Sequence, residues 1–350
     1  MYKLIDLAIP IIKSNFSELK LPYKLNFAIT YRCQSRCLTC NIWQMHPNNE
    51  LTLDEIKLFA SKNRFFKWVE LTGGEPFLRS DIYDIAKAIN DTNNIYMLTI
   101  PTNSLTNKDL IIRNLEKILN LGIPRVVITL SLDGYKELHD QIRGIKGNFD
   151  RVMDLAKALQ ELKNKHKNLS FYFGYTISRY NQGKLKETIE YVKNILPFVD
   201  FNYFHVNVGQ ISEHYYNNKN SNFIGEREAI KNDIRYLLKN RRFSLSPIEL
   251  VENAFIRNLI TYVDTGKSPM KNRSLEASIF LDSFGNVFPS IVWDYKLGNI
   301  RETNYDLIPI INSNDAKNIR KLIKEGKEPP SWTACEAYQT LVGDMHKILI

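Results

Sequence analysis

Cysteine is scarce in this sequence, which has four in 350 residues. Three of them fall within eight positions near the N-terminus, too close together to cross-link distant segments. A chain of this length with so few cysteines lacks the disulfide framework of small secreted domains. The sequence therefore predicts a reducing, cytoplasmic environment, in which the clustered thiols serve a purpose other than cross-linking.

Long runs of one charge sign are also missing. The chain has 47 basic and 38 acidic residues, a net charge of +9, but the basic residues are spread along it and form no arm. This balance is compatible with an anionic surface or a phosphorylated substrate. Nucleic-acid binding is not expected, because no stretch interleaves aromatic and basic residues in the manner of an RNA-binding module.

The N-terminal stretch is apolar, but it has no run long enough to span a membrane because Asp6 and Pro10 interrupt it. No small-x-small cleavage site follows, so a signal peptide is not expected. We expect residues 1–24 to form an amphipathic extension. Such a segment either packs onto its own domain or lies on a membrane surface through residues 1–22 and their lysines.

From residue 25 onwards, strand-like and helix-like stretches alternate with short connections. Six strand–helix units in succession predict a parallel sheet covered by helices, which either stays open or curls into part of a barrel. The helix that starts near residue 52 opens with a capping box, Thr52 and Glu55. In both forms of the sheet, a site is expected in the loops after the carboxyl ends of the strands. The expected strands are residues 24–31, 67–73, 94–103, 125–134, 169–178 and 199–209.

The alternation ends after about residue 245. Residues 246–350 are expected to form a separate, smaller domain with a helix over 247–264, two short strands around a Ser-Phe-Gly-Asn turn, and a last helix over 333–350. The chain is thus expected to divide into three parts: the extension, a large α/β domain over 25–245, and this α+β domain.

Cys33, Cys37 and Cys40 follow the first expected strand at its carboxyl end. Their C-x3-C-x2-C spacing lets three thiolates converge on one cluster of soft metal ions. Iron–sulfur clusters usually take four cysteines, so three local ones would leave one iron open to an outside ligand. On spacing alone, a structural zinc site with His46 as fourth ligand is the alternative.

A second motif, "ELTGGEP", ends the second expected strand with Gly73, Gly74, Glu75 and Pro76. Paired glycines let a ligand approach the backbone closely, and the amides and carbonyls exposed there can hold an amino-acid headgroup. Two glycines alone usually mark a turn. After strand two, with the three cysteines after strand one, they form a specific pair of signals.

With both motifs, the chain resembles the radical S-adenosylmethionine (radical SAM) enzymes, and within them the group with a C-terminal SPASM or twitch domain. The resemblance covers roughly residues 25 to 350. It includes "PTN" after strand three, "SLDGYKELHDQIRGIKGNFDRV" from strand four, and "GNVFP" with "LGNI" in the C-terminal part. It implies a partial (β/α)6 barrel of the TIM type over 25–245 and a small α+β domain over 246–350.

The resemblance also implies cofactors. Cys33, Cys37 and Cys40 would hold one [4Fe-4S] cluster, whose open iron would be chelated by S-adenosylmethionine. The GGEP segment would receive the methionine amino group. Arg143, whose guanidinium suits a carboxylate, would hold the carboxylate together with Ser131. Asn103 and Asn181 are weaker candidates for ribose contacts, because such asparagines are usually caps. Asp133 and His139 are expected to brace their loop.

In the family mechanism, an electron from a flavodoxin- or ferredoxin-like donor leads to a 5′-deoxyadenosyl radical, which removes hydrogen from an unactivated carbon. The "SLDG" run resembles the peptide-modifying branch, so the expected substrate is a peptide or a bulky metabolite. A lipid or isoprenoid at the membrane surface is the alternative, given the apolar N-terminal segment and the basic charge. A non-catalytic metal protein that binds nucleic acid is an alternative of another class.

The sequence departs from the family pattern in four places. Thr39 stands where an aromatic residue commonly borders the adenine. Where relatives carry further cluster cysteines, this chain has Ser290, Ser331 and Glu328, and Cys335 alone remains. We therefore expect the C-terminal domain to lack an auxiliary cluster; a cluster held by Cys335 with oxygen ligands is the alternative.

The missing cysteines also bear on the reaction. In sulfatase-maturing relatives, an aspartate follows the hairpin cysteine and serves as a base; Ile291 stands at that position here. Asp294 is the nearest substitute and is the candidate catalytic residue. Without auxiliary clusters, reactions that export an electron become less favoured than bond formation, epimerisation or redox-neutral rearrangement.

Overall fold

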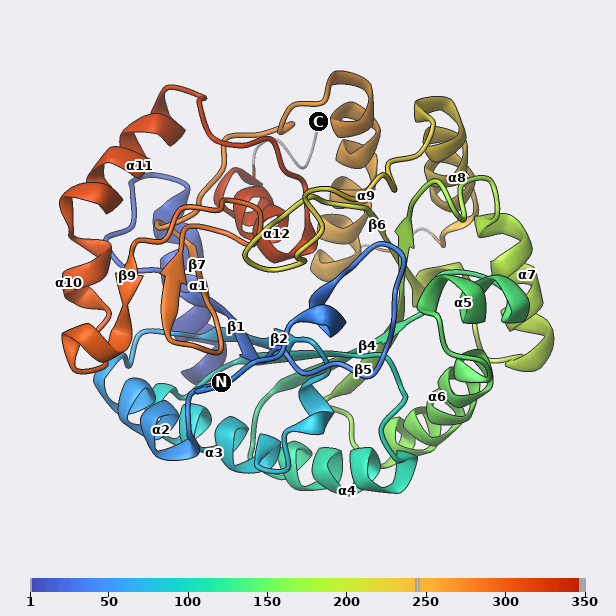
Figure 1. Cartoon of the computed structure of the whole chain (residues 1–350), viewed down its shortest axis with the longest axis horizontal. Coiled ribbons are helices and arrows are strands. Elements are labelled where there is room, and N and C mark those ends of the chain that lie inside the picture. The colour runs from blue at the N-terminus through green and yellow to red at the C-terminus, as the bar shows by residue number, and fades with distance from the viewer. Residues whose placement is uncertain (1, 243, 245, 346–350) are drawn as a thin grey trace.

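Six parallel strands form the body of the structure, and their connecting helices cover the outer face (Figure 1). The computed structural model describes residues 2–242, 244 and 246–345; Met1 and residues 346–350, which belong to the expected terminal segments, lie outside the described residues. Neighbouring strands follow one another along the chain, in the order β6-β5-β4-β3-β2-β1. The α/β class and the partial (β/α)6 barrel are thereby confirmed. The strands are β1 (Lys24–Thr30), β2 (Trp68–Gly73), β3 (Met97–Thr102), β4 (Arg125–Ser131), β5 (Leu169–Ile177) and β6 (Phe204–Val208).

The connecting helices bury one apolar face each. α2 begins with the predicted capping box, in which Thr52 and Glu55 satisfy each other's backbone amides. The next helix, Ile82–Asn93, has Asp81 at its N-cap without a side-chain hydrogen bond. The helices are α2 (Leu53–Lys62), α3 (Ile82–Asn93), α4 (Lys108–Leu119), α5 (Lys136–Arg143), α6 (Asn148–Lys165), α7 (Leu185–Ile195) and α8 (Arg227–Asn240).

Residues along the strands alternate between two environments. In β4, Val126, Ile128 and Leu130 are buried in the main apolar core, whereas the residues between them are partly exposed on the opposite face. β3, β5 and β6 show the same alternation. Because side chains of a strand point to alternate faces, the inner face of the sheet is a partly accessible and largely polar surface.

The C-terminal part continues the same sheet. β7 pairs with β1 in parallel, with Ser278 opposite Lys24, and β8 and β9 follow antiparallel. The hairpin was predicted, but not its pairing with β1, so the sheet has nine strands and crosses the expected boundary near residue 245. The elements are α9 (Pro247–Thr265), β7 (Ser278–Leu281), β8 (Asn286–Phe288), β9 (Gly298–Asn299), α10 (Ile308–Ile311), α11 (Asn314–Lys324) and α12 (Ala334–Gly343).

Helix α12 closes the interior of the barrel at the amino-terminal ends of the strands (Figure 1). Lys24 Nζ donates to the carbonyl of Cys335 (2.9 Å) and forms an ion pair with Glu70 (3.5 Å). The ring of Tyr338 stacks on that of Trp68, with 6.1 Å between centroids. Lys24 and Trp68 are the first residues of β1 and β2, so α12 fills this end and leaves the carboxyl ends of the strands for a site.

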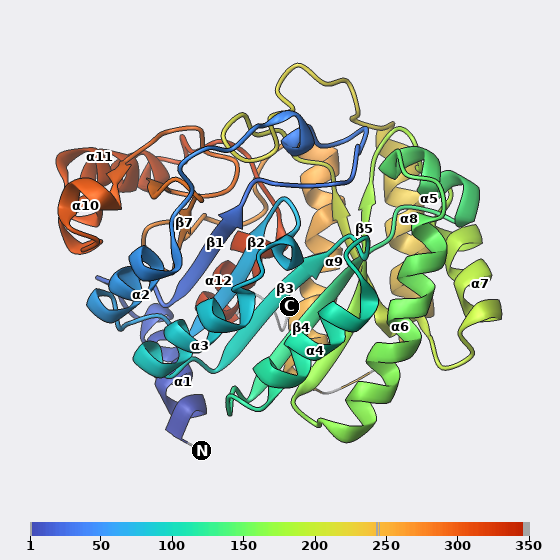
Figure 2. The ribbon, with the colours of Figure 1, turned by 60° about the horizontal axis from the view of Figure 1, so that its bottom comes forward.

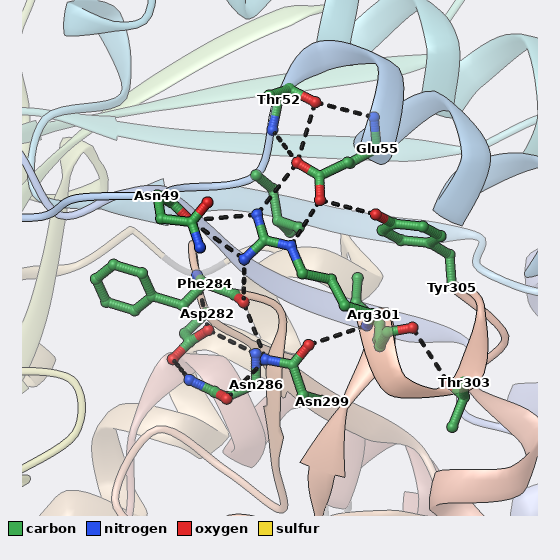
Figure 3. A network of polar contacts seen from close by, with 12 residues as sticks. Asn49, Thr52, Glu55, Asp282, Phe284, Asn286, Asn299, Arg301, Thr303 and Tyr305 are labelled. Atoms are coloured by element: carbon green, nitrogen blue, oxygen red, sulfur yellow. Dashed lines mark hydrogen bonds and ion pairs between the residues drawn. The ribbon is translucent and has the colours of Figure 1, made fainter.

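A polar network fastens the C-terminal part to the loop before α2 (Figure 3). Arg301 donates from Nε to Glu55 (2.6 Å), and both of its terminal nitrogens donate to the carbonyl of Asn49 (3.2 Å). The neighbouring Glu50 accepts from the backbone amide of Tyr31 (2.6 Å), where the cysteine loop starts. The C-terminal part therefore supports the residues that lead into the cysteine loop.

Helix α1 (Tyr2–Ser14) lies at the end of the strands opposite the cysteine loop (Figure 2). Just after it, Asn15 donates to the carbonyl of Val342 in α12 (2.8 Å). The expected amphipathic extension is thus a helix docked on the barrel. Within the described residues, no helix combines the length and the apolar character needed to cross a bilayer.

Candidate functional site

The three clustered cysteines lie in the loop after β1, at the carboxyl end of the strand. Their thiols are free. The loop is held by α5, because the backbone amides of Arg36 and Leu38 donate to the carbonyls of Arg143 and Ile142 (both 2.9 Å). This loop–helix pairing presents the cysteine loop at the mouth of the barrel, as the sequence predicts for a site.

The thiols are buried close to one another, and this disfavours their ionisation. Burial, followed by the neighbouring Cys37, raises the pKa of the Cys33 thiol to about 11. Burial and the other two cysteines likewise raise the pKa of Cys40. Burial also raises the pKa of Cys37, although Arg143 opposes the shift. Three thiolates become stable here when a positively charged metal centre neutralises them, so the donor set fits a metal cluster.

Among the described residues, no three His, Cys, Asp or Glu side chains are arranged to hold a single metal ion. The three cysteines and His46 are not gathered around one point in this structure, and His46 is exposed. A cluster of several irons binds each thiolate to a different iron, so its ligands need not converge on one point. The residues present thus fit an iron–sulfur cluster better than a single zinc ion.

The paired glycines bring the loop after β2 against the cysteine loop. Gly73 has φ +126°, and a Cβ atom there would stand 2.0 Å from the carbonyl oxygen of Thr30. A Cβ atom on Gly74 would stand 2.3 Å from the carbonyl oxygen of Arg32. The backbone amide of Gly74 donates to Thr30 (2.8 Å). The close approach that the glycine pair predicts for a ligand is made in the structure by the protein's own backbone.

Glu75 joins this loop to the next one. Its carboxylate accepts from the backbone amides of Phe77 (3.1 Å) and Asn103 (2.7 Å) and from the hydroxyl of Thr102 (3.0 Å). Complete burial raises the pKa of Glu75 to about 7 against these hydrogen bonds. Pro76 starts the short helical turn that follows. Glu75 therefore fixes the geometry of two loops at the site, a role that the motif alone did not reveal.

Arg143 lies between the cysteine loop and the end of β4. Its Nε is 2.6 Å from Asp133 Oδ2, and its Nη1 donates to Cys37 Sγ (3.7 Å). Its Nη2 has no acceptor among the described residues, so the guanidinium keeps donors for a further anion. Asp133 also accepts from the amide of Thr176 (3.3 Å), and its own amide donates to His139 (3.1 Å), so these two residues brace the loop. Ser131 ends β4 on the partly exposed inner face.

The remaining candidates differ in their freedom to bind a ligand. Asn103 Nδ2 donates to Cys33 Sγ (3.6 Å), which places Asn103 beside the cysteines. The Asn181 side-chain amide donates to the carbonyls of Asp133 and Thr176 and accepts from the backbone amide of Ser178, so it joins its turn to the loop after β4. The backbone carbonyl of Thr39 accepts a hydrogen bond from the side-chain amide of Asn218 (2.9 Å). Asn103 is therefore the better candidate for a ligand contact, and Asn181 has the hydrogen bonds of a structural cap.

The loop over residues 209–222 covers the cysteine loop, and sequence reasoning missed it. The amide of Asn41 donates to the carbonyl of Tyr216 (2.8 Å). The hydroxyl of Tyr215 is hydrogen-bonded to that of Thr72 on β2 (2.7 Å). Cys40 and Cys335 pack against the same buried aromatic group that contains Tyr215. No motif marks this loop, because its residues act through contacts with segments more than 100 positions away.

Cys335 lies at the start of α12 in the barrel interior, with Sγ 3.6 Å from Glu70 Oε1. Burial, followed by Glu70, raises its pKa well above the usual value. Of the oxygen ligands considered for an auxiliary cluster, the Ser290 hydroxyl accepts from the amides of Val292 (3.3 Å) and Trp293 (3.2 Å). Cys335 is thus placed between a carboxylate and an aromatic group, and its metal role stays a prediction.

The carboxylate of Asp294, the candidate catalytic base, is held in place by the hydrogen bonds that it accepts. It accepts from His214 Nδ1 (2.6 Å) and from the backbone amides of Glu213 and His214 (both 2.9 Å). Partial burial opposes ionisation, but the hydrogen bonds from His214 and these amides outweigh it and lower the pKa of Asp294 to about 2. A carboxylate stabilised in this way is a weak base, so the arrangement favours a structural role.

Replacing Asp294 with asparagine is expected to lower the free energy of unfolding by about 1–2 kcal/mol at pH 7, because a charge-assisted set of hydrogen bonds is lost at a partly exposed position. The pKa is lowered in the folded state, so this stability is present above the unfolded pKa of 3.8 and is lost as pH falls towards 2. Urea unfolding of both proteins at pH 7 and pH 3 measures the difference. Equal stability of the two proteins at pH 7 would instead leave the carboxylate available as a base.

Comparison with known proteins gives a matching family model and a shared fold. Residues 27–192 match the model of the radical SAM superfamily. The chain is 26% identical over 179 residues to the AdoMet-dependent heme synthase of Methanosarcina barkeri, covering 50% of this chain and 48% of that protein. It is 30% identical over 178 residues to the GTP 3′,8-cyclase of Limosilactobacillus fermentum, covering 49% and 50%. The chain spans about half the length of the curated relatives it matches.

Solved structures share the fold over nearly the whole chain. Native anSMEcpe with bound AdoMet has a TM-score of 0.60 at 16% identity, covering 94% of this chain and 98% of that one. SuiB of Streptococcus suis bound to S-adenosylmethionine has a TM-score of 0.57 at 15% identity, covering 95% and 74%. At these identities the likeness shows the fold alone.

Proposed function

We propose that the chain is a radical S-adenosylmethionine enzyme, because residues 27–192 match the model of the radical SAM superfamily. Cys33, Cys37 and Cys40 would hold one [4Fe-4S] cluster. Together, cluster and S-adenosylmethionine would supply a 5′-deoxyadenosyl radical that takes hydrogen from an unactivated carbon. The observation that carries the proposal is the set of three thiols in one loop, one buried and two half-buried, with Arg143 in contact with Cys37.

In this function the protein's own residues would bind and orient the cluster and S-adenosylmethionine. Arg143 and Ser131 would hold the methionine carboxylate, since Arg143 keeps free donors toward the site. The loop with Gly73, Gly74 and Pro76 would receive the amino group through its backbone, while Glu75 fixes that loop. Asn103 lies beside Cys33 and would contact the ribose. The loop over residues 209–222 would exclude water from the cysteines, because its tyrosines pack over them.

The proposed substrate is a peptide or a bulky metabolite. Two solved neighbours were studied with peptides: anSMEcpe with the Cp18Cys peptide and SuiB with the precursor peptide SuiA. The polar inner face of the sheet supports an extended polar substrate in this chain as well. A flavodoxin- or ferredoxin-like protein would donate the electron, in the cytoplasm. With Cys335 as the one cysteine of the C-terminal part, a redox-neutral reaction is favoured.

The test is the iron and sulfide content of the anaerobically reconstituted chain, together with release of 5′-deoxyadenosine after reduction. We expect about four irons per chain and deoxyadenosine formation. About eight irons would mean that Cys335 belongs to a second cluster and would restore an electron-exporting reaction. Zinc without deoxyadenosine would reject the radical SAM function in favour of a non-catalytic metal protein.

A further inference from the structure

Helix α1 is apolar on two faces, and one of them is exposed among the residues that the structure describes. Its inner face is docked by Leu7 and Ile11, which pack with Tyr23 and Trp68 at the amino-terminal end of the barrel. The outward face and the turn that follows α1 carry five large apolar side chains that are between 46% and 86% exposed. They recur at helical spacing along residues 2–16, as one stripe. They are Tyr2, Ile5, Ile9, Ile12 and Phe16, here called the α1 stripe.

The α1 stripe is unusual for this molecule. Apart from Leu4 on α1 itself and the pair Ile211 and Ile224 in the connection between β6 and α8, the other exposed large apolar side chains of the described residues lie on different elements and loops. Scattered side chains of that kind are normal on soluble proteins, whereas a contiguous row marks an interaction site. Because Leu7 and Ile11 already dock the helix on the barrel, the stripe is not required to hold α1 in place.

Charge around the α1 stripe indicates the chemistry of its partner. Lys13 and Lys20 are exposed and form no ion pair among the described residues, and the whole chain has a net charge of +9. Of the acidic residues on this segment, Glu18 is paired with Lys324 (3.0 Å) and Asp6 accepts from Asn94 (3.3 Å). An apolar stripe bordered by free lysines matches an anionic bilayer, in which apolar side chains enter the acyl boundary and lysines meet headgroups.

A second copy of the chain matches this surface less well. Two copies of net charge +9 repel each other, and a standard protein interface takes roughly 20–30 residues a side, far more than one short helix offers. We propose that the α1 stripe docks the protein on an anionic membrane surface. This proposal does not depend on the radical SAM function, because α1 lies at the opposite end of the barrel from the cysteines.

The position of α1 sets the orientation of the docked protein. α1 packs at the amino-terminal ends of the strands, while the cysteine loop lies at their carboxyl ends (Figure 2). A protein docked through the α1 stripe therefore carries its site on the side away from the lipid. Docking of this kind localises the enzyme and leaves the mouth of the barrel open to the aqueous phase. This orientation suits a peptide substrate in solution better than a lipid substrate in the membrane.

The test is flotation of the full chain with vesicles of equal parts phosphatidylglycerol and phosphatidylcholine, and with vesicles of phosphatidylcholine alone. We expect the chain to float with the anionic vesicles and much less with the neutral ones, and to be released by high salt. Ile9→Asp is expected to weaken anionic vesicle binding at least about tenfold, because it puts a charge into the apolar stripe.

Ile224→Asp is the matched control. Ile224 is about as exposed as Ile9, and the substitution adds the same charge away from α1. The control should bind vesicles within about twofold of the original chain, and both variants should keep its melting temperature. The proposal is overturned if the original chain does not float, if the two variants lose binding equally, or if Ile9→Asp turns a dimer into a monomer, since the stripe would then bind a second copy.

Discussion

Replacing Cys37 with serine is expected to abolish the iron–sulfur absorption of the reconstituted protein and to lower 5′-deoxyadenosine formation at least about a thousandfold. Cys37 is the most deeply buried of the three clustered cysteines, and its sulfur receives the hydrogen bond from Arg143. Serine is a poor ligand for iron, and a hydroxyl in this buried place does not ionise. With two thiolates left, the loop cannot hold the cluster.

Cys335→Ser provides the matched control for this experiment. It is the same thiol-to-hydroxyl change at another position in the barrel interior, where Cys335 contacts Glu70. We expect this variant to keep about four irons per chain and the absorption of the original protein. Full iron content and activity in the Cys37 variant would contradict the assignment of the three cysteines, whereas iron loss in the Cys335 variant would assign that residue to a cluster.

Replacing Arg143 with leucine is expected to lower the free energy of unfolding of the metal-free protein by about 3–5 kcal/mol, because it leaves the buried carboxylate of Asp133 without its partner. The two side chains are 15% and 4% exposed, and 2.6 Å separates Nε from Oδ2. Urea unfolding measures the loss. The double replacement Arg143→Leu with Asp133→Asn should recover part of it, since no uncompensated charge then remains.

Arg143→Lys separates the stability role of this residue from its binding role. Lysine keeps the charge beside Asp133 but loses the planar fork that grips a carboxylate. We expect this variant to stay folded and to bind S-adenosylmethionine at least about tenfold more weakly, as measured by equilibrium dialysis of the reconstituted protein. Unchanged affinity in a folded variant would show that Arg143 serves the cysteine loop and not the ligand.

The features that the sequence predicts are those with a local signal. Period-two strands and capped helices alternate along the chain, so the barrel could be read directly from residues such as Thr52 and Glu55. The cysteine and GGEP motifs follow the ends of the first two strands, and this position predicts where the site lies. Asp133 and His139 brace their loop as expected.

The features that the sequence missed depend on contacts between distant residues. The residues next to Asp294 in the sequence give no sign that His214, 80 positions away, donates a hydrogen bond to it and lowers its pKa. The residues next to Arg301 in the sequence give no sign that it donates a hydrogen bond to Glu55, 246 positions away. The glycines after β2 were correctly placed at the site, but their packing against Thr30 depends on the position of the neighbouring strand.

The pairing of β1 with β7 also has a consequence for the order in which the chain can fold during synthesis. β1 leaves the ribosome before β7, and its free edge meets its partner when Ser278 to Leu281 have emerged, more than 250 residues later. Until then β1 is an open edge strand, the kind of surface that pairs with other chains. A fragment that ends after β6 would keep this edge open, so the pairing with β7 covers an edge strand as soon as the C-terminal part has been made.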